Sequence, residues 1–567
     1  MPHRLDAPSA RPRWPVVALA AAAATATAGG TALAGGDEAQ PASAAPAVAT
    51  VDQPSGAAGG SRRTEAWHRA RAAAPPPILR SWRAPHVDAH GALGKVARRA
   101  EAHQLRDSTR VRDVLRRALL LRQIDRDTHD RHLTTWEGAL EAAQKLSGRR
   151  AKELGVVIHG VQNLSDRRLL SASRMTPVFL MLRENTRLWR TAKLPASRDR
   201  RTVADGAVVL EHYAGKGWQL QPLASWGKLN ALAARCLSAS QARQDGERTC
   251  PQERKRLRER LDTLLDLAVP RGGRYPAWEY LFSYAGGSPP WVSGMAQATA
   301  AQALARAGSA LDSGVYRNAA RDVVGAFEHA PPFGVAVPGP DDGSHYALYA
   351  FQPGLRVLNA ELQAVLALRD VSTLTGDTTA RGLYLRGDRA LRATLARYDT
   401  GAWSRYSIDG REATAGYHRL QRRLLGRMCE RTDRDAYCAP HQRFLRYESE
   451  APDIDLKVPE RTRTGREVTT RFTLSKTSRV ALRVADNRDK TNTTRVLDLP
   501  RGTHELTWTP WRGGPHTVRV EARGPTGPKE VVREKVRVAD PEGEGKKKSK
   551  GKKKGEGKKK REGKRED

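Results

Sequence analysis

The hydrophobic residues of this chain change their period near residue 455, and this change constrains the fold more than any other feature. Before it, apolar residues recur three and four positions apart, as in Val111, Val114 and Leu115, which predicts amphipathic helices. After it, apolar and polar residues alternate, as in 468–474, which predicts half-buried strands. A chain of 567 residues is also too long for one ordinary core, so we expect several domains.

The helical pattern covers an N-terminal region, 91–195, and a second region, 196–450. The second region opens with strand-like runs at 207–210 and 218–220, which predict a β-hairpin. Paired amphipathic helices joined by short loops are typical of an α/α toroid, in which loops at one end form a cleft. Helices are expected at 129–147, 149–164, 228–242, 253–267, 291–308, 313–329, 355–376, 379–397 and 413–430.

Residues 455–539 contain alternating runs separated by turn residues, which indicates a small immunoglobulin-like β-sandwich. Strands are expected at 468–474, 479–484, 493–499, 505–509, 516–522 and 530–538. The expected fold class is therefore multidomain and mainly α. It combines a toroid-type helical domain, opened by a short β-hairpin, with a small C-terminal β-sandwich.

The two ends of the chain have compositions that do not predict a core. Residues 1–34 carry arginines and then an Ala-rich apolar run ending in Ala32-Leu33-Ala34, which is typical of a cleaved secretory signal peptide. A membrane anchor is the alternative, although Ala, Thr and Gly make the run weakly apolar. Residues 35–90 and the Lys-rich tail, 540–567, are expected to be disordered. We therefore expect a secreted or cell-wall-associated protein.

The charge of the chain predicts polyanionic partners. Lys and Arg number 98 against 62 Asp and Glu, a net charge of +36, although part of this excess can reflect a compositional preference for Arg. Export disfavours nucleic acid and favours an acidic polysaccharide. The basic tail is either a solvated segment or an electrostatic contact to an anionic cell-wall polymer. Whether the chain forms a homodimer stays open.

The four cysteines fall into two pairs that are local in sequence. We expect disulfides Cys236–Cys250 and Cys429–Cys438, as in an oxidising compartment. A zinc site is the alternative, but the spacings lack the C-x-x-C pattern. No metal is therefore predicted.

Several motifs between residues 205 and 435 occur in a recognisable order. They include Trp291-Val-Ser-Gly-Met-Ala-Gln297 and Tyr346-Ala-Leu-Tyr349, the latter followed by Pro353 and Val357-Leu-Asn359. Tyr406 and Tyr417-His418 come later. In this order the motifs resemble the D-glucuronyl C5-epimerase family, although each of them alone is compatible with a packed core.

The resemblance implies an isomerase that inverts C5 of glucuronate in an acidic, uronate-containing polysaccharide without a cofactor. Abstraction of a proton next to a carboxylate needs a base on one face of the sugar and an acid on the other. By resemblance, Tyr349 and Tyr417 are the proton-transfer candidates, and Tyr406 positions the substrate. Candidate substrate-binding residues are His418, Arg411, Trp291, Gln297 and Glu279.

Two positions depart from the pattern of the family. Leu348 stands where the family has a glutamate, and Asp409 stands where it has an arginine. Glu279 is a candidate replacement for the missing carboxylate, and Arg411 for the missing arginine.

Two alternative functions remain open. A polysaccharide lyase would abstract the same C5 proton but would expel the substituent at C4. A non-catalytic cell-wall glycan-binding protein would keep the fold without the base, and Leu348 favours that interpretation.

Overall fold

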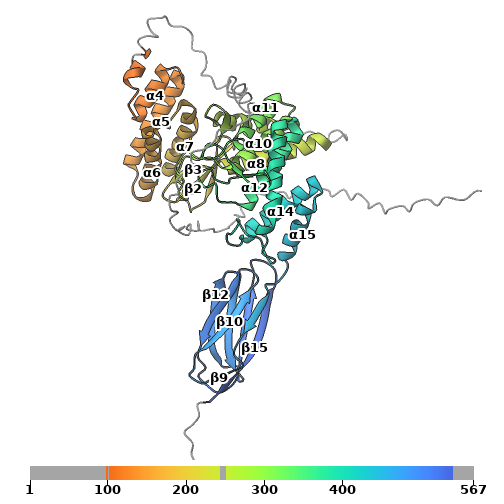
Figure 1. Ribbon diagram of the computed structural model, residues 1–567. Helices are drawn as coiled ribbons and strands as arrows, with labels where there is room; N and C mark the ends of the chain where they lie inside the picture. Colours follow the sequence, from red (N-terminus) through yellow and green to blue (C-terminus); the bar gives the residue numbers. More distant parts are fainter. Residues whose placement is uncertain (1–97, 100, 243–250, 541–567) are drawn as a thin grey trace, which may run out of the picture. The chain divides into compact units, whose positions relative to one another are not determined.

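The structure is a computed structural model that describes residues 98–99, 101–242 and 251–540 (Figure 1). The predicted signal peptide, the linker and all but the first residue of the basic tail lie outside these residues. Within the described part of the chain, no helix is both long and apolar enough to cross a membrane. Helices occupy residues up to 447, and the strands after that form two sheets, so the mainly α prediction with C-terminal strands is confirmed.

The N-terminal region consists of helices that bury one apolar face each. The carboxylate of Asp125 accepts the Thr128 amide hydrogen bond and so fixes the start of the second of these helices. Leu115, Leu154 and Leu182 lie completely buried where the helices meet. The helices are α4 (Val111–Leu120), α5 (Arg126–Lys145), α6 (Gly148–Asp166) and α7 (Ala172–Thr191).

The predicted hairpin is present as β2 (Val208–Tyr213) and β3 (Gly217–Leu220), with β1 (Arg200–Val203) added at its edge. Buried polar side chains of α6 and α7 hold it. The Glu153 carboxylate accepts the amide hydrogen bonds of Gly215 and Gly217, each at 2.9 Å. Asn185 accepts from the Trp218 amide and donates to the Trp218 carbonyl. The hairpin is thereby fastened to the N-terminal helices.

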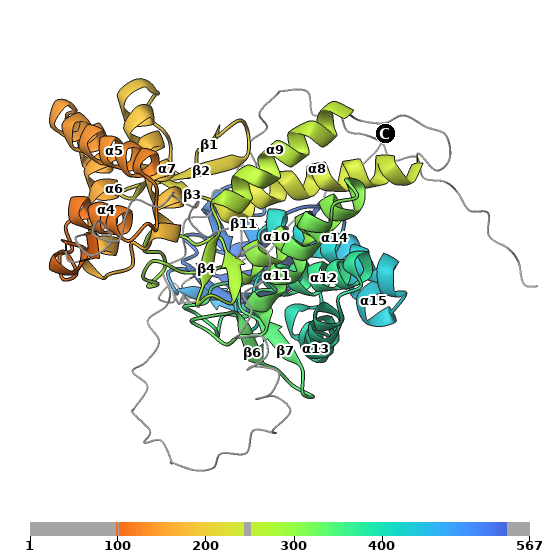
Figure 2. The same ribbon diagram turned by 90° about the horizontal axis from the view of Figure 1, so that it is seen from above.

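The second helical region is organised around α10 (Gly294–Ala310), which packs against α8, α11 and α12. Eight of the 17 residues of α10 are buried alanines, and these small side chains allow neighbouring helices to approach closely. Figure 2 shows α8 beside α9, and α10, α12 and α14 following one another. The other helices are α8 (Pro222–Ala242), α9 (Pro251–Asp266), α11 (Gly314–Val323), α12 (Leu358–Thr375), α13 (Thr378–Thr394), α14 (Ala415–Thr432) and α15 (Asp435–Tyr447).

Short strand pairs, which the sequence pattern did not predict, lead into the loops between these helices. They are β4 (Val269–Arg271) with β5 (Tyr275–Ala277), and β6 (Ala336–Pro338) with β7 (Ser344–Tyr346). Three-residue strands carry too little alternation to be recognised from sequence.

Helices α14 and α15 enclose a buried polar centre at His418. The Nδ1 atom lies 2.8 Å from the Ser404 hydroxyl and Nε2 lies 2.9 Å from the Phe444 carbonyl oxygen. The imidazole stacks on Trp403 at 3.7 Å between ring centres. Burial lowers the pKa of His418 to about 4, so the ring is neutral at neutral pH.

The C-terminal strands form two sheets that share one core, referred to below as the β region. Side chains of β10 alternate between buried and exposed, as the sequence predicts, and Phe472, Val484, Trp508 and Val518 meet in the shared core. Sheet orders are β13-β10-β8 and β12-β11-β14-β15-β9. The strands are β8 (Ile454–Lys457), β9 (Arg461–Arg463), β10 (Val468–Leu474), β11 (Ser478–Asp486), β12 (Thr491–Leu499), β13 (Gly502–Trp508), β14 (Gly514–Arg523) and β15 (Lys529–Ala539).

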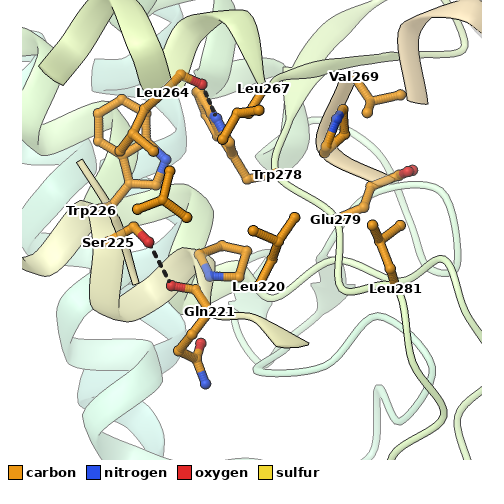
Figure 3. A pocket seen from close by; sticks show the side chains of 13 residues that line it. Leu220, Gln221, Ser225, Trp226, Leu264, Leu267, Val269, Trp278, Glu279 and Leu281 are labelled. Carbon is orange, nitrogen blue, oxygen red and sulfur yellow. Dashed lines mark hydrogen bonds between the residues drawn. The ribbon is translucent and has the colours of Figure 1, made fainter. Parts of the chain in front are cut away.

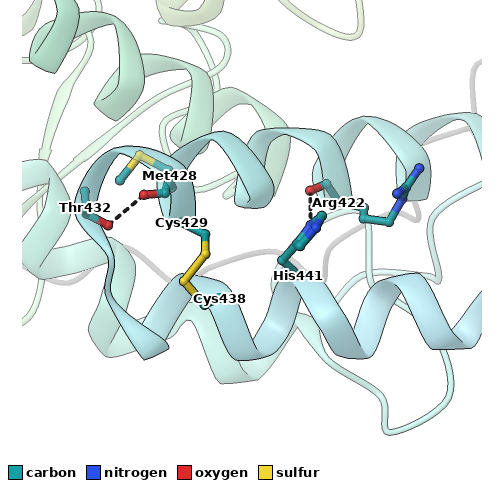
Figure 4. The surroundings of a disulfide bond; sticks show 6 residues. All are labelled: Arg422, Met428, Cys429, Thr432, Cys438 and His441. Carbon is teal, nitrogen blue, oxygen red and sulfur yellow. Dashed lines mark hydrogen bonds between the residues drawn. A yellow bond between two sulfur atoms is a disulfide. The ribbon is translucent and has the colours of Figure 1, made fainter. Parts of the chain in front are cut away.

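A disulfide joins Cys429 to Cys438, which confirms one predicted pairing (Figure 4). It links the end of α14 to α15, a helix that the sequence pattern did not predict. Cys236 is buried on α8, and Cys250 lies outside the described residues, so the second pairing stays a prediction. Among the described residues, no group of three or more His, Cys, Asp or Glu side chains is placed to hold a metal ion.

Replacing both Cys429 and Cys438 by serine should lower the free energy of unfolding by about 2–3 kcal/mol, because the disulfide closes a short loop in the unfolded chain. Urea titration followed by circular dichroism measures this change, with the helical signal in buffer as the control for folding. An unchanged unfolding midpoint would contradict the prediction.

Replacing Gly217 by alanine should destabilise the protein by about 1–3 kcal/mol. Gly217 has a φ of +71°, and an added Cβ would lie 2.4 Å from Cγ2 of Val157. Gly227→Ala is the matched control, because Gly227 lies within α8 with no atom within 4 Å of an added Cβ. The control should be neutral or stabilising. Equal unfolding midpoints for the two variants would contradict the close packing of Gly217 against Val157.

Stability should fall as the pH drops from about 6.5 toward 4, because the buried His418 must remain neutral in the fold. The folded pKa of His418 lies below the unfolded value, so its contribution is complete above pH 6.5 and is lost as pH falls through the folded value. The full loss is on the order of 3 kcal/mol. Urea titrations between pH 4 and 8 test this, and His418→Gln should show a shallower pH slope than the parent protein.

Candidate functional site

Aromatic side chains from separate segments pack into one cluster next to the hairpin. Tyr280 stacks on Trp291 with 4.1 Å between ring centres, and Trp291 contacts Tyr349 edge to face at 5.5 Å. The aromatic side chains of this cluster come from the end of β2, the loop after β5, the segment just before α10 and the loop after β7. The aromatic cluster consists of Tyr213, Tyr280, Phe282, Tyr284, Trp291, Tyr349 and Phe351.

Main-chain hydrogen bonds fix these rings in place. Tyr280 and Trp291 exchange two backbone hydrogen bonds, and the Trp291 indole donates to the Phe282 carbonyl at 2.8 Å. The amide of Gly294 donates to the Ala347 carbonyl, whose oxygen would lie 2.4 Å from an added Cβ. A glycine at 294 therefore lets the segment that ends in Tyr349 approach the start of α10.

The structure brings the three predicted tyrosines together. Tyr406 and Tyr417 lie edge to face with ring centres 4.8 Å apart. Tyr349 and Tyr406 pack against the same small apolar cluster, formed by Leu348, Val357 and Ala360. Tyr417 occupies the first turn of α14, which Thr414 caps. These tyrosines adjoin the aromatic cluster and form the candidate reaction centre.

Burial raises the pKa of Tyr349 well above 10, and the neighbouring phenols of Tyr406 and Tyr284 raise it further. Tyr349 therefore keeps its proton at neutral pH. In a proton-transfer reaction, such a side chain is suited to donate a proton.

Neither Leu348 nor Glu279 supplies a free carboxylate that could act as a base at this centre. Leu348 is buried in the apolar cluster that supports Tyr349. Glu279 is buried, but its oxygens are bound by Arg174 at 2.6 Å and Arg271 at 2.9 Å. The Glu279 carboxylate thus holds the segment leading to Tyr280, and both of its oxygens are already engaged.

A buried carboxylate that sequence analysis missed lies on β2. Glu211 accepts from Arg198 at 2.8 Å and from Arg200 at 2.7 Å. The Arg198 guanidinium also lies 4.9 Å from the centre of the Tyr213 ring. The sequence signal was available, because an acid inside a continuously buried strand needs charged partners.

Gln221 was also missed, and it connects the hairpin to the aromatic cluster. Its amide nitrogen donates to the Tyr213 hydroxyl at 2.9 Å, and its amide oxygen accepts from the Tyr280 hydroxyl at 2.7 Å. Gln221 thereby sets the separation of two tyrosine hydroxyls at one side of the cluster.

The remaining predicted residues lie at the periphery. His418 uses both ring nitrogens inside the α14–α15 layer and so supports the helix that carries Tyr417. Gln297 is buried and bonds the main chain at Trp278 and Pro276. Arg411 is exposed, and its carbonyl accepts the Tyr406 amide hydrogen bond at 3.0 Å. Asp409 is exposed and paired with Arg397.

A separate apolar pocket lies between α7, the hairpin and α9 (Figure 3). Its walls include Leu220, Trp226, Trp278 and Leu281. The enclosed space has room for about one water molecule and is too small for a sugar residue.

Residues 272–446 match the family model described as the D-glucuronyl C5-epimerase C-terminus. The matched range includes Glu279, Trp291, Tyr349, Tyr406 and Tyr417. Residues of the hairpin, which supply Glu211 and Tyr213 to the site, lie before it. Residues 272–446 of this chain are therefore similar to the C-terminal part of D-glucuronyl C5-epimerases.

Proposed function

We propose that this protein inverts C5 of D-glucuronate residues in an acidic polysaccharide. The observation that carries the proposal is that Tyr349, Tyr406 and Tyr417 lie close together beside the aromatic cluster. They come from two separate loops and from the first turn of α14. The match of residues 272–446 to a C5-epimerase family model supports an isomerase in general terms.

The reaction needs groups that act on opposite faces of the sugar ring. The C5 proton is weakly acidic because the adjacent carboxylate stabilises little of the carbanion charge unless the site neutralises it. One side chain removes the proton, and another returns a proton to the opposite face. The reaction is redox-neutral, so side-chain acids and bases can carry it.

The tyrosines divide these tasks. Tyr349 is the proton donor, because burial keeps its hydroxyl protonated. Tyr417 is the base that removes the C5 proton, and Tyr406, packed against Tyr417, positions the sugar between them. Arg411, exposed on the loop that carries Tyr406, binds the uronate carboxylate.

The finer architecture and location are part of the same proposal. Successive contacts α8–α10–α12–α14 support an α/α toroid, and two sheets with a common core support an immunoglobulin-like sandwich. The disulfide supports an oxidising compartment, which fits export through residues 1–34 and a basic tail that binds an anionic wall polymer.

Leu348 favours a second candidate, a glycan-binding protein that lacks catalysis. Leu348 is buried in the apolar cluster against which Tyr349 packs. The family carries a carboxylate at this position. On this view the tyrosine centre would bind uronate chains without exchanging the C5 proton.

Incubation with a glucuronate polymer in deuterated water should place deuterium at C5 without shortening the chain. Removing a proton-transfer hydroxyl typically costs about 10²–10⁴-fold in rate, so Tyr417→Phe and Tyr349→Phe should each lose exchange by that factor. Tyr316→Phe is the control, since the Tyr316 hydroxyl donates to Asp262 on α9 and Tyr316 belongs to neither the aromatic cluster nor the tyrosine centre. Mass spectrometry and NMR measure the exchange.

The same experiment separates the alternatives. An unsaturated uronate absorbing in the ultraviolet, with shorter chains, would identify a lyase. Binding without any exchange in the parent protein would identify the non-catalytic candidate. Equal exchange by Tyr417→Phe and Tyr316→Phe would remove Tyr417 from the mechanism.

A further inference from the structure

Trp511 in the β region has an unusually exposed side chain. It is 48% exposed, whereas every other tryptophan in the described part of the chain is buried. Leaving a large indole in water forgoes the free energy of burial, and its apolar faces and polar N–H suit it to a binding surface.

The loop that carries Trp511 is held from several sides. The Trp511 amide donates to the side chain of Asn492 on β12, and Asn492 donates back to the Thr509 carbonyl at 2.9 Å. The Pro510 carbonyl accepts from Gly465 at 2.8 Å, and Gly513 donates to Asp540 at 3.0 Å. The indole is thus presented by a braced loop.

One cation lies against the indole, and others lie on neighbouring segments. The Arg512 guanidinium lies 5.1 Å from the centre of the Trp511 ring. The β11–β12 turn, which the buried Asp486 holds through the amides of Arg488 and Lys490, adds two exposed cations. Asp486 at the end of β11 pairs with His516 near the start of β14, so the β11–β12 turn and the loop that carries Trp511 lie at the same end of the sheet.

The acidic side chains on these segments either have bonding partners already or are fewer than the cationic side chains. Asp489 pairs with Arg483 at 3.1 Å, and Asp540 accepts the Gly513 amide hydrogen bond. Glu467 is exposed beside Arg466 on the turn that bonds Pro510. The cations on the same segments are Arg466, Arg483, Arg488, Lys490 and Arg512.

We propose that Trp511 and Arg512 form a second, non-catalytic binding site for acidic polysaccharide on the β region. The open part of the indole stacks on the C–H face of a sugar ring, and Arg512 binds the carboxylate of a neighbouring uronate through paired N–H donors. Asn492 and the exposed threonines of the β12 edge supply hydrogen bonds to hydroxyl groups. The site would hold a long chain near the protein while the tyrosine centre acts on it.

The test uses the full chain and an immobilised oligosaccharide of alternating glucuronate and N-acetylglucosamine, with a neutral dextran as the comparison. Trp511→Ala and Arg512→Ala should each weaken binding of the acidic chain about tenfold, as expected for a central aromatic or arginine contact. Trp511→Phe should retain most of the affinity. Arg471→Ala is the charge-matched control, because Arg471 is an exposed arginine on β10 paired with Glu505.

Binding is read out directly, so the outcome does not depend on whether C5 exchange occurs. Trp511→Ala binding as tightly as the parent would overturn the proposal. So would equal losses in Arg512→Ala and Arg471→Ala that vanish at high salt, which would indicate unspecific charge attraction. Equal binding of dextran would contradict recognition of acidic sugars. Exchange on a short oligosaccharide should be the same in all variants, because it needs only the tyrosine centre.

Discussion

The site depends on one buried ion pair network, in which the Glu279 carboxylate is held by Arg174 and Arg271. Arg174 belongs to α7 and Arg271 to β4, so one carboxylate ties the N-terminal helices to the loop that begins at Tyr280. A buried charge that loses its partner typically costs about 3–5 kcal/mol. The network therefore fixes where the loop lies, and the stacking of Tyr280 on Trp291 follows from that position.

The same principle recurs at the hairpin. Glu153 and Asn185 satisfy main-chain groups of the turn and of β3, while Arg198 and Arg200 neutralise Glu211 on β2. In each case a buried polar side chain must find partners, and the partners lie on another element. The N-terminal helices are thus part of the site's support, although the family match begins only at residue 272.

The sequence predicted most long elements because their periods are distinct. The α5 and α6 helices and the strands from β10 to β15 follow from hydrophobic periodicity, and the meeting of Tyr349, Tyr406 and Tyr417 followed from motif order. Periodicity could not reveal pairing between elements. Glu279 was considered as a replacement carboxylate because sequence does not show its pairing with Arg174 and Arg271, which lie 105 and 8 residues away along the chain. Gln221 was missed for the same reason, whereas Glu211 could have been recognised as an acid inside an apolar strand.

The aromatic cluster and the candidate reaction centre together draw their side chains from the hairpin, the loops around β5 and β7, the loop that carries Tyr406, and the first turn of α14. During synthesis from the N-terminus, Tyr213 and Tyr280 therefore emerge well before Tyr417 can join them. The loop that carries Tyr406 becomes ordered, at a cost in conformational entropy, when α14 packs against α12. This contact is distant in sequence from the hairpin. A chain cut before α14 would contain every residue of the aromatic cluster but would lack Tyr417, the proposed base. The proposed proton transfer thus requires a side chain from a late segment of the helical region as well as the earlier aromatic residues.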